Sequence, residues 1–196
     1  MSSSWPVTLR YGDLVIRPLR VSDYADWRQV RSANQQWLGE WEATSPRPRL
    51  EPAPTFRQSA RKALRDARAG KAMPFVLEFQ GKFVGQLNVS DITTGALWSA
   101  HMGYWIDEQV ANQGIMTKAV ALVTEHLFTH AKLHRVEIAI RPENVPSNRL
   151  VAKLGFQFEG VRKSFLHING QWRDHNIYVM LQEDFSPGLV TKIAPH

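Results

Sequence analysis

The feature that most constrains the fold lies in the second half of the chain, where strand-like and helix-like segments alternate. Two β-type runs, Phe75–Phe79 and Lys82–Val89, are separated by Gln80-Gly81, which is typical of a tight hairpin turn. Further strands are predicted at His101–Asp107 and at Arg135–Ile140, which is rich in β-branched residues.

Helices are predicted between and after these strands. An amphipathic helix extends from about Ile115 to Ala131, after a turn that contains Gly114, and a shorter one from Ser147 to about Leu154. A final hairpin joins Phe156–Ile168 to Trp172–Leu181 across Asn169-Gly170. Together these elements predict a mixed α/β domain.

The first third of the chain is predicted to be mainly helical, over about residues 22–70. A strand at Leu14–Leu19 precedes a helix from Tyr24, which Ser22 and Asp23 are expected to cap. A second helix runs from a Thr55 cap to about Ala69. Between them lie a stretch with Trp37, Leu38 and Trp41 at helical spacing and a proline-rich loop at residues 45–54. The three tryptophans Trp27, Trp37 and Trp41 are expected in the core, with one of them at the rim of a cleft.

Length and composition exclude several classes of protein. The chain has 196 residues, which fits one domain over residues 1–196. It has no cysteine, so disulfides, thiolate metal sites and cysteine nucleophiles are excluded. Neither a secretory signal nor a run of about 18 apolar residues is visible. We therefore expect a cytoplasmic protein that does not act at a membrane.

The positive charge is concentrated in one segment. The chain carries a formal net charge of +6, and the segment from Arg47 to Lys71, with eight bases and two acids, accounts for all of it. One interpretation is a solvated helix face; the other is a surface for an acidic or RNA-bearing partner such as a ribosomal particle.

A candidate anion site lies at the start of the long helix. The helix dipole and unpaired amides at a helix N-terminus favour negative charge, and Gly114 has no side chain to obstruct a phosphate. The loop matches neither a Walker A loop nor a dinucleotide-binding turn, so it supports neither class of nucleotide site. An ordinary helix start is the alternative interpretation.

A second motif points to a known family. Asn144-Val-Pro-Ser147 leads into a helix that ends in Leu154-Gly155-Phe156, and Glu159-Gly160 follows. This pattern resembles the GNAT superfamily of N-acetyltransferases. The later run Gly170-Gln-Trp-Arg-Asp-His175 is similar to the RimJ-like branch, the ribosomal-protein-alanine N-acetyltransferases. The turn Ala111–Met116 occupies the position of the family's pyrophosphate loop and keeps only its central glycine.

The resemblance implies the GNAT fold, a single α/β domain whose mixed, mostly antiparallel sheet splays between His101–Asp107 and Arg135–Ile140 to admit acetyl-CoA. It implies that the backbone at the end of the first strand faces the cofactor and stabilises an oxyanion, while amides from Gln113 to Thr117 hold the pyrophosphate. The cofactor-binding residues implied are Trp105, Ile106, Asp107, Gln113, Gly114, Ile115, Met116, Thr117, Asn144, Asn148 and Lys153.

The predicted catalytic residues are Ser147 and Tyr104. Ser147 resembles the family hydroxyl that supports the departing thiolate, and a helix N-cap is its alternative role. Some relatives place a glutamate in the strand at residues 164–168, where this chain has Leu166. Candidates for a general base are therefore Tyr104, Asp91, His101 and His167. The pair His126 and His130 has no third ligand nearby in sequence, so no metal is predicted.

The predicted activity is transfer of acetyl from acetyl-CoA to the N-terminal α-amino group of a protein, with a ribosomal protein that begins with Ala or Ser as the expected acceptor. One alternative is acetylation of a small-molecule amine, although the basic segment would repel polyamines and cationic antibiotics. The other is a ribosome- or RNA-binding factor that retains the fold, with direct nucleic-acid binding by the basic helix.

Overall fold

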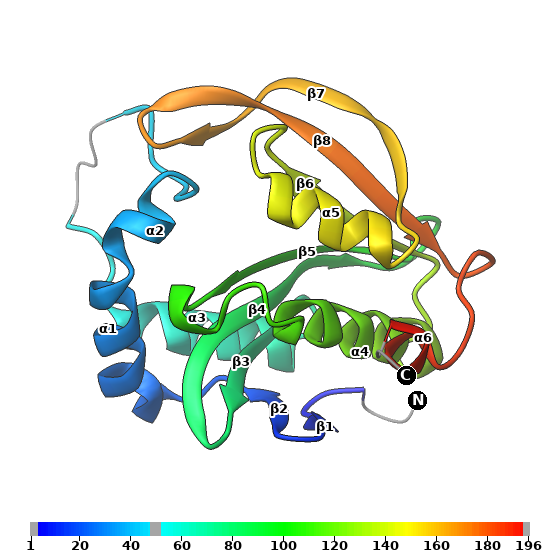
Figure 1. The fold of residues 1–196 in the computed structure, drawn as a ribbon, viewed down its shortest axis with the longest axis horizontal. Helices are drawn as coiled ribbons and strands as arrows, with labels where there is room; N and C mark the ends of the chain where they lie inside the picture. The colour runs from blue at the N-terminus through cyan, green and yellow to red at the C-terminus, as the bar shows by residue number, and fades with distance from the viewer. Residues whose placement is uncertain (1–3, 48–51, 194–196) are drawn as a thin grey trace.

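The computed structural model describes residues 4–47 and 52–193, and its strands form one sheet (Figure 1). The sheet has eight strands in the order β1-β2-β3-β4-β5-β6-β8-β7. Every neighbouring pair is antiparallel except β5 and β6, which are parallel. The strands are β1 Leu9–Tyr11, β2 Leu14–Pro18, β3 Met73–Phe79, β4 Lys82–Thr93, β5 Ser99–Ile106, β6 Arg135–Ile140, β7 Gln157–Ile168 and β8 Gln171–Leu181.

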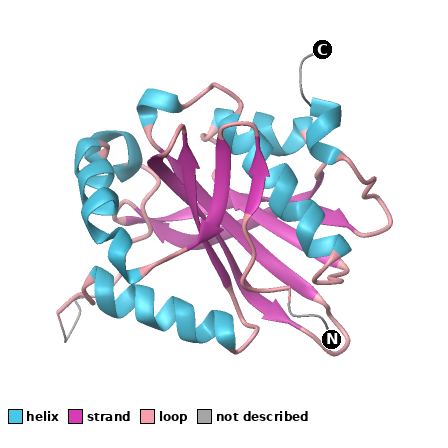
Figure 2. Cartoon of the chain, turned by 90° about the horizontal axis from the view of Figure 1, so that it is seen from below, coloured by secondary structure: helices cyan, strands magenta, loops and turns pink. Residues whose placement is uncertain are grey.

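Helices lie on both sides of the strands (Figure 2). Among the residues that the structure describes, no helix has both the length and the apolar character needed to span a bilayer. The α-helices are α1 Tyr24–Ala33, α2 Gln35–Gly39, α3 Phe56–Arg68, α4 Ile115–Thr129, α5 Val145–Lys153 and α6 Leu189–Ile193, and the 3-10 helices are η1 Val21–Asp23 and η2 Glu108–Val110.

Alternation along the strands divides the core between the two faces of the sheet. Phe75 and Leu77 of β3 belong to a large hydrophobic cluster that includes buried residues of α4 and α5. Val76, between them, belongs to a smaller cluster with residues of α1 and α3. Because successive strand side chains point to opposite faces, β3 alone anchors both layers. The sheet therefore separates α4 and α5 from the first helices.

Both predicted hairpin turns are confirmed. Gln80-Gly81 joins β3 to β4 with φ of 52° and 75°, and Asn169-Gly170 joins β7 to β8 with φ of 46° and 80°. Glycine and asparagine accept this left-handed conformation most readily. The hairpin β7–β8 runs past α5 in Figure 1.

One predicted cap is confirmed and another is wrong. Thr55 caps α3, since its hydroxyl accepts a hydrogen bond from the Gln58 amide. Asp23 does not cap α1: its carboxylate accepts hydrogen bonds from the Arg17 guanidinium at 2.8 and 3.0 Å and from the Arg20 amide at 2.7 Å. A buried guanidinium needs a charged partner, and that need takes precedence over the cap.

The basic segment is only partly described. Arg49 and Glu51 lie outside the described residues, as does the middle of the proline-rich loop. In α3, Ala60 and Ala67 are buried, whereas four arginines are exposed. The helix therefore packs through its alanine face and presents its bases to solvent. The exposed arginines are Arg57, Arg61, Arg65 and Arg68.

Candidate active site

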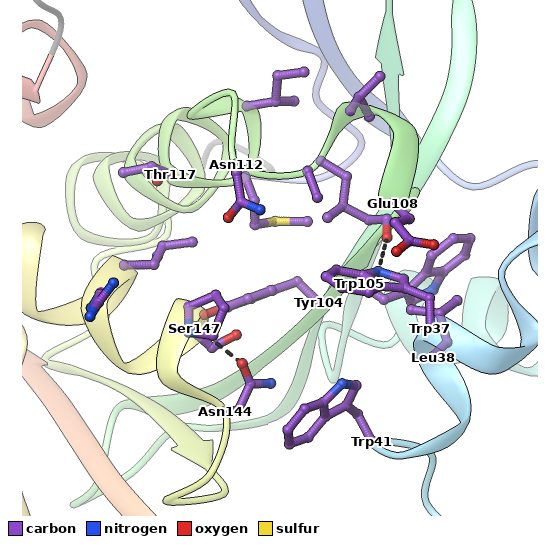
Figure 3. Close-up of a pocket in the computed structure, with 18 of the residues that line it drawn as sticks. Trp37, Leu38, Trp41, Tyr104, Trp105, Glu108, Asn112, Thr117, Asn144 and Ser147 are labelled. Atoms are coloured by element: carbon purple, nitrogen blue, oxygen red, sulfur yellow. Dashed lines mark hydrogen bonds between the residues drawn. The ribbon is translucent and has the colours of Figure 1, made fainter.

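A cavity of about 830 Å³ lies where β5, α4 and α5 come together (Figure 3). This volume is within the range of small-molecule and cofactor sites. Ten of the thirteen predicted site residues line it: Tyr104, Trp105, Ile106, Gly114, Ile115, Met116, Thr117, Asn144, Ser147 and Lys153.

Beside this cavity, strands β5 and β6 pair with each other over only part of their length. The register of β5 with β6 joins Ser99–His101 to Arg135–Glu137, whereas β5 continues to Ile106 and β6 to Ile140. A smaller cavity, of about 160 Å³, is lined by residues 102–104 of β5 and 138–140 of β6. Because Tyr104, Asn144 and Ser147 line both cavities, the smaller one adjoins the larger one at these residues.

The N-terminus of α4 opens into the larger cavity. Gly114 is its N-cap, with φ of 73°, and no side chain caps the first turn. The first amides of a helix have no acceptor within the helix, and an α4 of fifteen residues adds a full macrodipole. This end of the cavity therefore suits an anionic group.

Tyr104 and Ser147 form the centre of the site. The Tyr104 hydroxyl is buried and has no hydrogen-bond partner within the described residues. Burial raises the pKa of this phenol far above its ordinary value; Ser147 acts in the opposite direction, although the two hydroxyls miss the geometry of a hydrogen bond. An unpaired buried hydroxyl costs stability unless something else binds it. Tyr104 therefore stays protonated and is available to a ligand.

Ser147 is not the N-cap of α5, which was its predicted alternative role. The cap is Asn144, whose side-chain oxygen accepts a hydrogen bond from the Ser147 amide at 3.1 Å. Ser147 lies inside the first turn, so capping does not require its hydroxyl. The Ser147 side chain lies beside Tyr104 at the cavity wall (Figure 3).

Three predicted cofactor-binding residues have side chains that are hydrogen-bonded elsewhere, and for Asp107 and Gln113 the prediction concerned the backbone. Asp107 accepts from the Asn34 amide group at 2.9 Å, and Gln113 donates to the Gln109 carbonyl at 3.2 Å. Asn148 accepts from Asn176 and from the Tyr178 hydroxyl, which ties α5 to β8. None of the three lines the cavity, so for these side chains the structure lends no support to cofactor contact.

The histidine and aspartate candidates for a general base do not line either cavity. His101 lies 3.3 Å from the Asp91 carboxylate and 3.4 Å from that of Glu137. His167 shares a hydrogen bond of 2.8 Å with the Thr44 hydroxyl. These three side chains therefore lie outside both cavities, and the function proposed below does not use them.

Sequence reasoning missed the wall contributed by α2. Trp37 and Leu38 of α2 and the following Glu40 and Trp41 line the larger cavity. Two of the three tryptophans expected in the core or at a rim, and not one, therefore lie at the cavity. The Trp37 indole donates to the Ile106 carbonyl at 3.1 Å, which fixes α2 against the end of β5. The helical spacing of these residues was the available signal. Helical spacing predicts that these side chains share one face of the helix, but it does not predict which element that face contacts.

His175 was also missed. It is 4% exposed and lines the smaller cavity with Tyr104 and Ser147. It lies in the run that carries the resemblance, but its place at this cavity depends on the sheet order, in which β8 lies next to β6. Within the described residues, no group of three or more acidic or histidine side chains has an arrangement suited to a metal ion.

Comparison with known families agrees with this geometry. Residues 13–157 match the acetyltransferase (GNAT) domain. The chain belongs to the GNAT acetyltransferase family. The fold is that of the family, with a mixed, mostly antiparallel sheet of eight strands in the described residues.

Two solved structures of GNAT proteins are similar over nearly the whole chain. RimJ of Mycobacterium smegmatis, in complex with CoA-disulfide, is 34% identical; the match covers 98% of this chain and 96% of RimJ, with a TM-score of 0.87. The ribosomal-protein-S5-alanine acetyltransferase of Vibrio fischeri is 27% identical, with coverage of 93% and 100% and a TM-score of 0.82.

Curated relatives match over a shorter length. The probable N-acetyltransferase YjcK of Bacillus subtilis is 39% identical over 103 residues, 53% of this chain and 57% of YjcK. The ribosomal protein uS5-alanine N-acetyltransferase of Escherichia coli is 32% identical over 107 residues, 55% of each chain. The matched region thus spans little more than half the length of these relatives.

Proposed function

We propose that this GNAT chain is an acetyl-CoA-dependent N-acetyltransferase that acetylates the N-terminal α-amino group of a protein, with a ribosomal protein as acceptor. One observation carries the proposal: a buried Tyr104 hydroxyl, without a hydrogen-bond partner in the described part of the chain, lies beside Ser147 where the two cavities meet. The names of the relatives from Escherichia coli and Vibrio fischeri support a ribosomal acceptor. Such an acceptor would place the reaction in the cytoplasm, and the whole chain would act as one domain.

The residues of the larger cavity fit acetyl-CoA. Its pyrophosphate suits the uncapped N-terminus of α4, where a side chain at Gly114 would also strain the turn at φ 73°. Amides of residues 114–117 are proposed to hold the phosphates, and Lys153 at the cavity wall adds a positive charge. When bound, acetyl-CoA would supply the thioester that is the acetyl donor.

Tyr104 and Ser147 are proposed to donate hydrogen bonds to the sulfur as it leaves. A phenol with a raised pKa stays neutral across the physiological range and keeps the hydrogen that it can donate to the departing thiolate, which can only accept. Donors already in place where negative charge develops lower the barrier because they need no reorganisation. The buried position of the Tyr104 hydroxyl increases the strength of this interaction.

The α2 wall suits a small N-terminal residue. Trp37, Leu38 and Trp41 provide apolar surface, and Glu40 provides a negative charge near an incoming ammonium. An α-amino group has a pKa of about 7.7–8.0 against about 10.4 for lysine, so near neutral pH it is far more often in the nucleophilic form. This difference favours an N-terminus over a lysine side chain.

Release of CoA tests the proposal. Since the chain has no cysteine, a thiol reagent detects the CoA thiol without interference from the protein. We expect CoA release with peptides that begin with Ala or Ser, and saturable acetyl-CoA binding by calorimetry. Tight binding of acetyl-CoA without turnover on any N-terminal peptide, or turnover on small amines alone, would contradict the proposed acceptor.

A further inference from the structure

The smaller cavity contains a titratable group that the proposed mechanism has not used. It lies where β5 and β6 no longer pair with each other, and its wall includes Tyr104, Ser147 and Trp41, which also line the larger cavity. His175 of β8 completes the wall and is 4% exposed. Among the described residues, His175 is the only histidine that lines either of the two cavities.

The hydrogen bond of His175 fixes its tautomer. Nδ1 lies 3.0 Å from the Arg173 carbonyl, which can only accept, so the proton of the neutral ring is on Nδ1. The lone pair is then on Nε2, which has no hydrogen-bond partner in the described part of the chain. The ring is therefore held in the form in which Nε2 accepts a proton.

The surroundings keep this ring neutral near pH 7. Burial is the largest effect and lowers the pKa of His175; the Arg173 carbonyl raises it, and the Arg141 guanidinium lowers it. The Glu143 and Asp174 carboxylates act in the opposite direction to Arg141. On the paired strand β7, Arg162 is the register partner of His175, and its guanidinium binds Glu137. The Phe165 ring meets the imidazole edge to face at 5.8 Å.

We propose that Nε2 of His175 is the proton acceptor for the incoming amine, directly or through one water in the smaller cavity. The inference rests on the proposed function. In this step the neutral α-amine attacks the thioester carbonyl; as the C–N bond forms and the C–S bond breaks, the nitrogen gives one proton to Nε2 and CoA leaves as the thiolate. The imidazolium then returns the proton to solvent. Tyr104 and Ser147 remain donors on the sulfur side, so the acid and base roles fall to different residues.

The first test uses the free protein and does not depend on activity. Nitrogen-15 NMR of the full chain is expected to show the Nδ1–H tautomer of His175 and a pKa below the ordinary value of about 6.5. A peptide amide that begins with Ala is expected to shift the Nε2 resonance. An Nε2–H tautomer, or an ordinary histidine pKa, would overturn the proposal.

The second test is a pH profile of kcat/KM. In the acid limb of the wild type, two ionisations, those of the amine and of His175, are expected to give a slope of 2. His175→Gln is expected to lower kcat by about 10²-fold or more and to reduce the slope to 1. The control, His167→Gln, alters a histidine in the same hairpin outside both cavities and is expected to keep the wild-type profile.

A third variant separates chemistry from folding. His175→Ala is expected to lose activity and to regain part of it when imidazole is added, because the removed ring leaves space beside the 160 Å³ cavity. A His175→Gln enzyme with wild-type rate and slope, or a His175→Ala enzyme without rescue although folded, would overturn the role of His175 alone. A wild type that acetylates no amine would overturn the proposed function and this inference with it.

Discussion

At the scale of single residues, the Tyr104 hydroxyl is expected to contribute to activity but not to the stability of the fold. This hydroxyl is buried and has no partner among the residues that the structure describes, so Tyr104→Phe removes an uncompensated polar group. We expect the melting temperature of the variant to equal or exceed that of the wild type, while kcat falls on the order of 10²-fold. Calorimetric melting and steady-state CoA release measure the two effects. A variant that melts lower with kcat unchanged would assign the hydroxyl a structural role.

Residues also show where sequence reasoning reached its limit in the site. The motif Asn144-x-x-Ser147 located the end of the cavity, but Ser147 also fitted a helix N-cap, and only the 3.1 Å bond from the Ser147 amide shows that the cap is Asn144. Asp107, Gln113 and Asn148 were implied by the family resemblance. Their side chains contact η2, β8 and Asn34, which follows α1, and sequence spacing does not show these contacts.

At the scale of elements, the β4–β5 contact positions the cavity wall. A Cβ at Gly85 would lie 2.3 Å from the Trp105 carbonyl oxygen, so Gly85→Ala must displace β5 where it lines the cavity. We expect a loss of about 1–3 kcal/mol in the free energy of unfolding, measured in urea, and weaker acetyl-CoA binding. Gly103→Ala, where a Cβ meets nothing within 4 Å, is the stability control. Equal stability of the two variants would contradict this account.

The exposed face of α3 gives a second prediction at this scale. Reversing Arg57, Arg61 and Arg65 to Glu is expected to raise KM for a protein or ribosomal substrate and to leave acetyl-CoA binding intact, because none of them lines the cavity. A matched control reverses three exposed bases elsewhere, Arg10, Lys82 and Lys132. If both triple variants use the protein substrate as the wild type does, α3 is a solvated surface.

Local signals predicted most elements of the fold. The two hairpins, α3 with its Thr55 cap, and α4 after Gly114 were all read from turn and cap residues close in sequence. The three-residue β1 and the short α6 were missed, since neither is long enough to show a period. The α2 wall was missed as a site element because its neighbour, the end of β5, is distant in sequence.

At the scale of the whole molecule, buried histidines link stability to pH. His126 is 5% exposed; burial is the main cause of its lowered pKa, the Ser4 carbonyl raises it and His130 lowers it. The unfolded chain therefore binds the proton more readily than the folded one as pH falls below about 6.5. We expect the free energy of unfolding to be level above pH 7 and to decrease below 6.5.

Urea titrations at a series of pH values measure this decrease. His126→Gln is expected to make the decrease smaller, whereas His134→Gln, which replaces a half-exposed ring, leaves it unchanged. A wild type whose stability increases between pH 6.5 and 5.5 would show that the sign is wrong.

The central claim is that the cavity between β5, α4 and α5 transfers acetyl to an N-terminal α-amine. The most direct measurement is fragment mass spectrometry of a peptide that begins with Ala and contains one internal lysine, after incubation with the full chain and acetyl-CoA near pH 7.5. We predict a single acetyl group on the α-nitrogen, with far less product from Tyr104→Phe. Acetylation of the lysine alone, or no product with acetyl-CoA bound, would contradict the account.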